Sequence, residues 1–452
     1  MKKIMLFIFL SSYLIAQSQE FPGYRSFTNN GVNGVFFNPA SIAGNAYKFD
    51  INLFSINTIV GNNKADFNLR SIGRSLNFDS LKKQMFSAMG GPATGYVNVT
   101  INGPSLMLRL NNRTAVALTT RARSIANIID LDGKLAEQVV DDLESNVQLP
   151  YGISSNTDMR VAANAWTEIG ISIGRTLFEK NQHVLKGGLT LKYLGGVGNG
   201  YFNVENLNAR IDDDLLGNVY MDNASGTISM GFGGINISNV EAGDFFNFKN
   251  SGFGADLGFI YEYRPASSGS YKYKAGISLT DLGSIRYNRD MQRSGSYRLD
   301  ITGSEKFYFD ELSGKDFEEY NAVFQSRPQF FTPLGSQEAT YKVALPATVH
   351  VDLDYLIKKG FYTSLHAQLP LNSDAYYNPR NYSAFTLTPR FETKFFAFAL
   401  PVNYNALTNF NMGLALRAGP LFFGSGSVLS ALFGSSKQAD AHFGLRFGGL
   451  KK

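Results

Sequence analysis

The feature that most constrains this chain is an alternation of apolar and polar residues with a period of two. In residues 168–176, isoleucines at every second position alternate with Glu168, glycines and a serine. Because successive side chains of a β-strand point to opposite faces, each such stretch predicts a strand with one apolar and one polar face. The pattern recurs at 183–196, 254–264, 271–281, 341–356, 360–370, 408–418 and 439–448.

The length and the polar faces of these strands decide the fold class. They run about 9 to 12 residues, the length that a tilted strand needs to cross a bilayer, whereas strands of soluble sandwiches usually have about 5 to 6. The polar faces carry glycines and ionisable groups, and the apolar faces carry aromatic residues toward their ends. We therefore predict an all-β protein, a transmembrane antiparallel β-barrel of about 14 strands, within roughly 12 to 16. The alternative, a soluble sandwich, has to bury all these aromatic residues.

Ionisable side chains on the polar phase are predicted to face the lumen, because a charge facing lipid at the midplane costs roughly 2–4 kcal/mol. Two interpretations of these groups stay open. They form a selectivity lining for a solute, or they pair with one another and hold the lumen shut or rigid. The candidate lumen-lining residues are Glu168, Lys186, Lys192, Asp256, Glu262, His350, Asp352, Asp354, His366, Arg390, Arg417 and Arg446.

The first residues have the pattern of an export signal. Lys2 and Lys3 precede an apolar run at 4–15, and Ala16-Gln17-Ser18 provides a small-x-small cleavage site. We predict a signal peptide at 1–18; an uncleaved membrane anchor is the alternative, although the run is shorter than the roughly 20 residues that a spanning helix needs. Export together with the barrel predicts the outer membrane of a Gram-negative bacterium, with outer-membrane lipid as a partner.

The composition excludes several chemistries. The chain has no cysteine, so disulfides, thiolate metal sites and cysteine nucleophiles are excluded. The four histidines lack zinc-binding spacing, and neither a nucleophile elbow nor a phosphate-binding loop is present. We therefore expect no enzyme activity, cofactor or metal; a barrel hydrolase with His350 or His366 as its base is the one enzyme alternative. The net charge is +5, but the sequence contains no long run of consecutive basic residues, so a nucleic-acid partner is not expected.

The remaining segments interrupt the strand pattern. Residues 19–45 are rich in glycine and asparagine and contain a proline turn, so they join a ladder poorly and are predicted to form a plug or hatch. The barrel is predicted over 46–452, with a long loop at 303–338. Helical spacing predicts short loop helices at 79–89, 124–143 and 427–434.

The run 34–44, which contains Asn38-Pro39-Ala40, resembles the signature near the N-terminus of barrels of the long-chain fatty-acid transporter type. It also resembles the related Bacteroidota barrel that serves as the shuttle in type IX secretion. The whole chain, including 417–422 and the closing hairpin, is similar to an uncharacterised Bacteroidota family of outer-membrane barrels. The resemblance implies a barrel of about 14 strands with an N-terminal hatch, in which Asn38, Pro39 and Ala40 are hatch or turn residues.

The C-terminal residues 444–447 resemble the closing-strand signal that the barrel-assembly machinery reads, which makes that machinery an expected partner during biogenesis. Three functions are expected from these patterns. The first is a channel or transporter for a small polar, amphipathic or hydrophobic solute. The second is a non-conducting barrel that acts in protein secretion or surface assembly, as in type IX secretion, with exported or surface proteins as partners. The third is a structural barrel that carries no solute.

Overall fold

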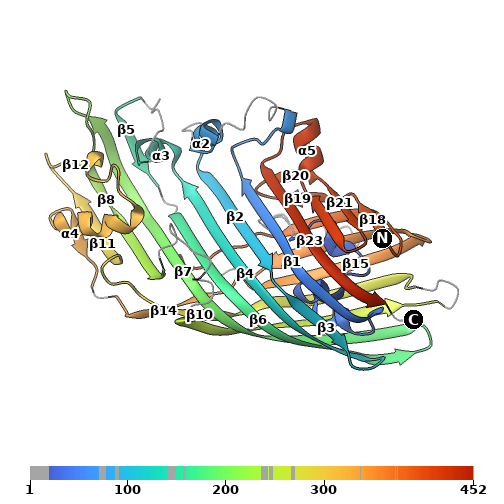
Figure 1. Ribbon diagram of the computed structural model, residues 1–452. Helices are drawn as coiled ribbons and strands as arrows, with labels where there is room; N and C mark the ends of the chain where they lie inside the picture. Colours follow the sequence, from blue (N-terminus) through green and yellow to red (C-terminus); the bar gives the residue numbers. More distant parts are fainter. Residues whose placement is uncertain are drawn as a thin grey trace, which may run out of the picture.

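Long, tilted antiparallel strands dominate the molecule, and a smaller lobe stands at one end of them (Figure 1). The computed structural model describes residues 20–70, 78–86, 91–139, 148–155, 158–235, 243, 248–265, 270–335, 337–371, 373 and 375–450. The predicted signal peptide, 1–18, lies outside these residues. Among the helices in these ranges, none has the length and apolar character needed to cross a membrane.

Within the described residues, 23 strand segments form one sheet that closes into a barrel of fourteen antiparallel wall strands, which confirms the predicted fold class. Several wall strands consist of two segments separated by a glycine or proline, because proline cannot donate to a ladder. The wall strands are, in order, β1 (Tyr47–Asn62), β2 (Ala93–Asn102) with β3 (Ser105–Arg109), β4 (Thr114–Leu131), β6 (Met159–Lys180), β7 (His183–Asp213), β9 (Asn250–Tyr263), β10 (Tyr273–Asn288), β14 (Thr340–Ala344) with β15 (Thr348–Lys358), β16 (Phe361–Pro370), β17 (Ala384–Glu392), β18 (Phe396–Ala399) with β19 (Val402–Asn405), β20 (Asn409–Met412) with β21 (Leu414–Ala418), β22 (Leu421–Ser425) and β23 (Gln438–Leu450).

The barrel closes between its first and last strands, where Tyr47 of β1 lies opposite Leu450 of β23. At this end, which we call the turn end, short turns such as 181–182 and 359–360 join the strands. The opposite end, the loop end, carries the longer connections and the helices α2 (Phe78–Phe86), α3 (Gly133–Val139) and α5 (Val428–Phe433). Membrane barrels place short turns on the periplasmic side and long loops outside.

The two faces of each wall strand differ as the alternation predicts. Ile171 on the outward face of β6 is 67% exposed, while Glu168 and Ser172 on the inward face are buried. Near the turn end, the rings of Tyr263, Tyr273 and Tyr355 stack along three neighbouring strands, with centroids 5.1 and 6.2 Å apart. Aromatic rings in this position match the belt that membrane proteins place at the lipid headgroups.

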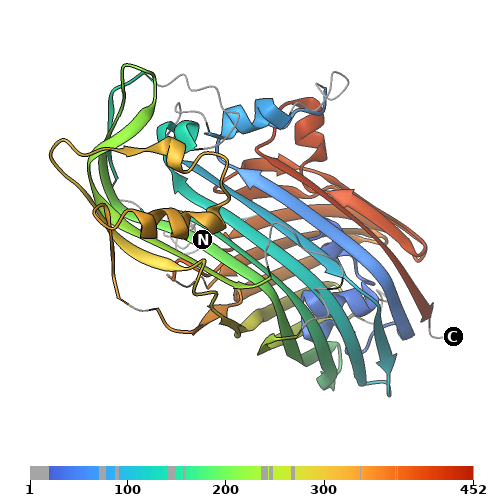
Figure 2. The same cartoon turned by 60° about the vertical axis from the view of Figure 1, so that its left-hand side comes forward.

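The lobe at the loop end, which we call the loop-end lobe, is built on the extension of β7 beyond the wall (Figure 2). The segment 303–338, predicted as a loop, supplies several of its elements. The lobe has an apolar core in which Phe324 and Phe331 stack at 4.4 Å. Its further elements are β5 (Tyr151–Ser154), β8 (Val219–Gly234), β11 (Gly295–Ile301), β12 (Phe307–Tyr308), η7 (Phe309–Glu311), η8 (Phe317–Glu319), α4 (Tyr320–Ser326) and β13 (Phe331–Pro333).

Two of the predicted helices are close to α2 and α5, but the prediction at 124–143 is wrong over its first half. Residues up to Leu131 continue β4, paired with β2 on one side and β6 on the other. Of the described residues in this range α3 is helical, and 140–143 lie outside the described residues. The cause is that apolar residues occupy both faces of this strand end. Ile125 points into an apolar cluster inside the barrel, while Leu131 packs against the core of the loop-end lobe.

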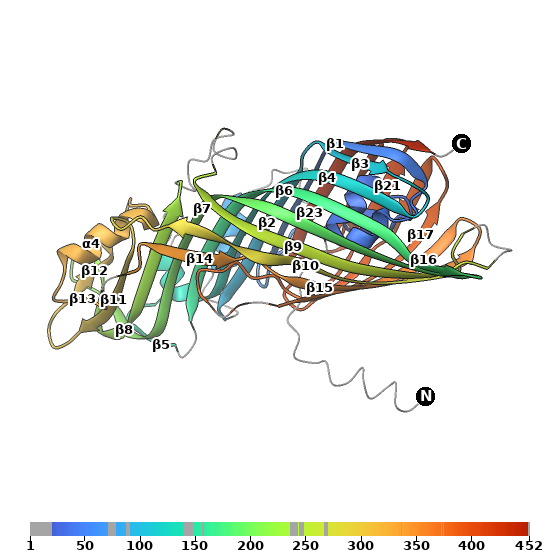
Figure 3. The same ribbon diagram turned by 90° about the horizontal axis from the view of Figure 1, so that it is seen from below.

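Residues 21–44, which we call the N-terminal segment, lie inside the ring of strands (Figure 3). They form three short helical turns, η1 (Tyr24–Ser26), η2 (Gly31–Phe36) and η3 (Pro39–Ile42). The turn η1 contacts β21 and β22, η2 contacts β1, β3 and β4, and η3 contacts β6, β7 and β9. The segment therefore touches the wall on opposite sides of the interior.

Candidate functional site

Asn38 fixes the last turn of the N-terminal segment to the wall. Its side-chain oxygen accepts a hydrogen bond from the Ala40 N–H at 2.9 Å, and Pro39 stands at the first position of η3. This is the usual chemistry of a capped turn, since proline lacks the N–H that would go unbonded there. The Asn38 amide nitrogen donates to the backbone oxygens of Phe259 and Ile277, each at 3.2 Å. The structure therefore places Asn38, Pro39 and Ala40 in a turn that docks on β9 and β10.

This turn rests on a glycine patch formed by Gly174, Gly188 and Gly258, which lie opposite one another on β6, β7 and β9. A Cβ added to Gly258 would lie 2.1 Å from the Asn38 Oδ1, and one added to Gly188 would lie 2.3 Å from the Ala40 nitrogen. A Cβ on Gly174 would lie 2.6 Å from an Ile42 side-chain carbon. The backbone of the N-terminal segment thus approaches the wall so closely that side chains at these three positions are excluded.

A second anchor lies where the barrel closes. Arg446 of β23 pairs with Asp50 of β1 and donates to the backbone oxygen of Asn29 at 2.7 Å. The Asp50 carboxylate also accepts a hydrogen bond from the Val32 N–H at 2.7 Å. Gly31 between them has φ +52°, and a Cβ there would overlap the Arg446 guanidinium. The segment is therefore held to the wall by hydrogen bonds at two places, at residues 29–32 and at Asn38.

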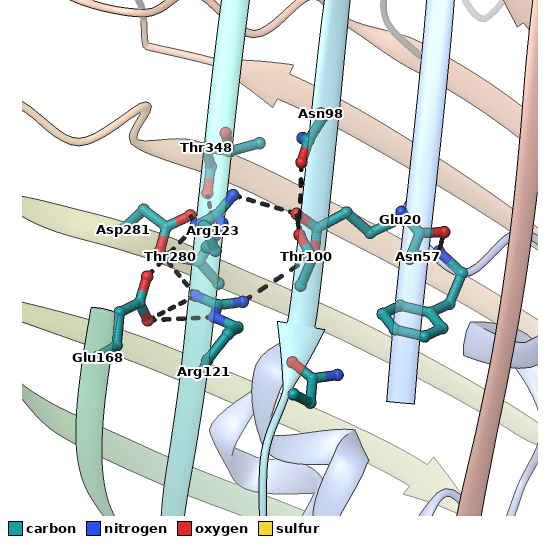
Figure 4. Close-up of polar contacts among 12 residues, drawn as sticks. Glu20, Asn57, Asn98, Thr100, Arg121, Arg123, Glu168, Thr280, Asp281 and Thr348 are labelled. Carbon is teal, nitrogen blue, oxygen red and sulfur yellow. Dashed lines mark hydrogen bonds and ion pairs between the residues drawn. The ribbon is translucent and has the colours of Figure 1, made fainter. Parts of the chain in front are cut away.

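On the loop-end side of the glycine patch, a cluster of ion pairs crosses the barrel interior (Figure 4). The Arg121 Nη2 lies 2.8 Å from the Glu168 Oε2, and the Arg123 Nη1 lies 2.7 Å from the Asp281 Oδ2. The Lys192 Nζ lies 2.7 Å from the Asp281 Oδ1. We call the following residues the central network: Glu20, Arg121, Arg123, Glu168, Lys192, Asp256 and Asp281.

The central network joins five strands, β4, β6, β7, β9 and β10, to Glu20. Lys192 of β7 also lies 2.7 Å from Asp256 of β9, and Arg123 of β4 lies 3.1 Å from Glu20, just before the N-terminal segment. The side chains from the strands are buried. A buried charge that loses its partner costs several kcal/mol, so these groups hold one another in place.

Predicted lumen residues nearer the turn end also meet in pairs. The Lys186 Nζ lies 2.6 Å from the Glu262 Oε1. Arg390 makes two contacts with the Asp354 carboxylate, at 3.0 and 2.7 Å, and the Tyr271 hydroxyl donates to the same group at 2.7 Å. Bidentate pairs of this kind are among the stronger polar contacts in proteins.

The remaining predicted residues also lie on the inward face. The His366 Nδ1 lies 2.8 Å from Asp352, and the His350 Nε2 lies 3.1 Å from the Thr280 hydroxyl. The two histidine rings stack at 5.4 Å. Arg417 lies 3.5 Å from the Glu392 carboxylate, which also accepts the Thr28 N–H at 3.0 Å. Within the described part of the chain, no group of three or more His, Asp or Glu side chains is placed to hold a metal ion.

Sequence reasoning missed four members of the central network. Arg121 and Arg123 lie on the inward face of β4. They were missed because a helix was predicted from residue 124, so the strand was expected to end before it. Asp281 follows Thr280 on the same face because a bulge interrupts β10 between Leu279 and Leu282, and its φ is +61°. Glu20 precedes the N-terminal segment and carries no strand pattern. For the two arginines, the signal was present in the alternation itself.

A vestibule of about 1120 Å³ opens at the turn end of the barrel, between this opening and the N-terminal segment. Its lining mixes charged and apolar side chains. The charged ones include Lys186, Glu262, Asp352 and Asp354, and residues of the segment itself also contribute. The central network leaves only a space of about 20 Å³ beside it. Further toward the loop end, Tyr201, Tyr287 and Tyr341 pack with Trp166 in an apolar layer.

A second cavity, of about 130 Å³, lies in the loop-end lobe and is lined almost entirely by apolar side chains. It adjoins the outward face of the extended strands, because Met159 and Val161 of β6 alternate with the inward-facing Arg160 and Ala162. An apolar cavity of about 150 Å³ stays dry and accepts benzene. The lobe cavity therefore matches a small apolar molecule in size and lining.

Closed strands, an apolar outer face and a charged interior define a transmembrane β-barrel. Residues 39–426 match the family of unknown function DUF5723, and the chain belongs to that family. Among curated proteins nothing matches the chain.

Three similar solved structures share low sequence identity with this chain. A Pseudomonas aeruginosa FadL homologue shares 10% identity over 96% of this chain and 98% of its own, with a TM-score of 0.44. The Ralstonia pickettii toluene transporter TbuX shares 10% identity over 97% and 100%, with a TM-score of 0.45. The Pseudomonas putida toluene transporter TodX shares 8% identity over 96% and 99%, with a TM-score of 0.37.

Proposed function

We propose that this protein is an outer-membrane transporter of a Gram-negative bacterium, which admits a small hydrophobic or amphipathic solute and uses its N-terminal segment as a gate. The observation that carries the proposal is the docking of this segment above an open vestibule. Apart from the chain link to β1 through residues 45–46, non-covalent contacts hold residues 21–44 to the wall. At the glycine patch these contacts rest on backbone without side chains. A segment held in this way can move without unfolding the barrel.

The apolar cavity of the loop-end lobe supports the choice of solute. It offers about 130 Å³ on the side of the barrel that faces the exterior in this proposal. The vestibule offers a larger space, of about 1120 Å³, on the periplasmic side. The paired residues of the central network then close the interior in the resting state.

The gate is tested by conductance across planar bilayers, and by swelling of liposomes in small sugars, with two matched glycine substitutions. Gly258→Ala places a methyl group 2.1 Å from the Asn38 Oδ1 and displaces the turn. Gly276→Ala on the neighbouring strand makes only ordinary contacts, at 3.5 Å or more. We expect Gly258→Ala to raise conductance and swelling, Gly276→Ala to leave both unchanged, and deletion of residues 20–44 to give the largest increase. Equal, low values for all four proteins would contradict the gate.

The packed interior favours a second candidate, a non-conducting barrel that serves protein secretion or surface assembly. The central network and the tyrosine layer fill the middle of the barrel. In this case the loop-end lobe would bind an exported or surface protein. Photo-crosslinking from exposed Phe317 in the lobe, followed by mass spectrometry, distinguishes the candidates. A single specific protein partner supports the second function, and lipid adducts alone contradict it.

A further inference from the structure

The outward face of the barrel carries one cationic notch near the loop end, lined by Lys249, Ser251, Gly252, Phe253, Ser284, Arg286, Asn288 and Lys342. Its volume is about 510 Å³. Arg286 of β10 stands between two neighbours in register, Ser251 of β9 and Lys342 of β14. The adjacent Ile285 and Tyr287 belong to the apolar layer inside the barrel, so Arg286 points outward.

The notch lies where the outward face changes from apolar to polar. Toward the turn end, the outward residues of β9 and β10 include Leu257, Phe259 and Ile277, all exposed. The change occurs beside Phe253, whose aromatic ring is 75% exposed and forms one wall of the notch. Aromatic residues mark the boundary between hydrocarbon and headgroups. The cations of the notch therefore stand at headgroup level on the outer leaflet side.

Neither Arg286 nor Lys342 pairs with a carboxylate among the described residues, in contrast to the paired cations of the central network. Like charges directly opposite each other on neighbouring strands are destabilising. Two cations side by side therefore need an anion from outside the protein. Lysine and arginine beside a membrane surface attract anionic headgroups, and the arginine fork binds phosphate with two parallel hydrogen bonds.

We infer that this notch binds the phosphate groups of a phosphorylated glycolipid in the outer leaflet, with Arg286 and Lys342 as the ligands. Phe253 packs beside the first carbons of the acyl chains, and Ser251 and Asn288 supply polar groups next to the phosphate. The inference rests on the outer-membrane location proposed above, but it requires neither transport nor movement of the N-terminal segment.

The test is native mass spectrometry of the purified full-length protein in detergent with three added probes: diphosphorylated lipid A, the same lipid without phosphates, and inorganic phosphate. We expect wild type to retain the phosphorylated lipid, and the double variant Arg286→Gln/Lys342→Gln to bind it about tenfold more weakly. The matched control, Arg175→Gln/Lys358→Gln, removes the same charge from the outward side at the turn end and should bind like wild type.

Equal retention of the lipid with and without phosphates overturns the inference, and so does undiminished binding by Arg286→Gln/Lys342→Gln. Saturation by inorganic phosphate as readily as by the lipid assigns the notch to a free anion and overturns the lipid claim. Both double variants replace exposed side chains, and an unchanged melting temperature shows that each is folded. If the notch does not bind the lipid, the results of the conductance experiments remain valid, because those experiments depend only on the barrel interior.

Discussion

The barrel wall and the loop-end lobe use the same strands with the same apolar outward face, but they cover that face differently. In the wall, outward residues such as Ile171 stay exposed, to be covered by lipid. Beyond the wall, the outward residues Met159 and Val204 are buried under α4 and its neighbours. The difference shows that the chain supplies its own apolar cover where the hydrocarbon layer ends, since an exposed apolar face in water is unfavourable.

On the inward face of the wall, charged side chains are buried and paired with one another. A substitution in this central network is expected to have the largest effect on stability. Asp281→Asn removes a carboxylate that contacts Arg121, Arg123 and Lys192. Because buried cations then lack a partner, we expect a loss of roughly 3–5 kcal/mol in the free energy of unfolding. Urea unfolding in lipid vesicles measures this. Asp300→Asn on the exposed side of β11 is the control, and an equal loss for both variants would show that the central network adds no stability of its own.

The outward face of the wall is tested by Ile171→Arg. An arginine facing lipid near the midplane should cost roughly 2–4 kcal/mol of unfolding free energy. Leu216→Arg, at a residue 87% exposed between β7 and β8, places the same charge in water and should change stability little. The same vesicle unfolding assay applies. If both substitutions are tolerated equally, the outward face of β6 does not contact lipid.

The part of the outward face that the loop-end lobe covers is tested by Leu312→Trp. Leu312 lines the apolar cavity of the lobe, and the larger tryptophan ring fills this cavity. We expect binding of a small aromatic hydrocarbon, measured by equilibrium partition into the detergent-solubilised protein, to weaken about tenfold, or about 1.4 kcal/mol. Ile171→Trp adds the same ring outside the cavity and should leave binding unchanged. Binding that survives Leu312→Trp would place the hydrocarbon site elsewhere.

How far the sequence predicts the site differs between its parts. The twelve ionisable residues on the polar phase follow from alternation alone, because side-chain direction in a strand is a local property. Their partners do not: Asp281 reaches the inward face through a bulge, and Glu20 has no periodic neighbour. The helix predicted at 124–143 failed because β4 is apolar on both faces near the loop end.

From residue order alone it follows that the strands are amphipathic, that their charges face away from lipid and that residues 21–44 stay outside the ladder. These are local consequences of residue order. The folded barrel is needed to see which charges meet and that three glycines from β6, β7 and β9 form one patch against Asn38. The same holds for the lobe, which covers the outward face at one end. Strand register and barrel closure bring together residues that are tens to hundreds of positions apart, and an alternation with a period of two contains no information about such contacts.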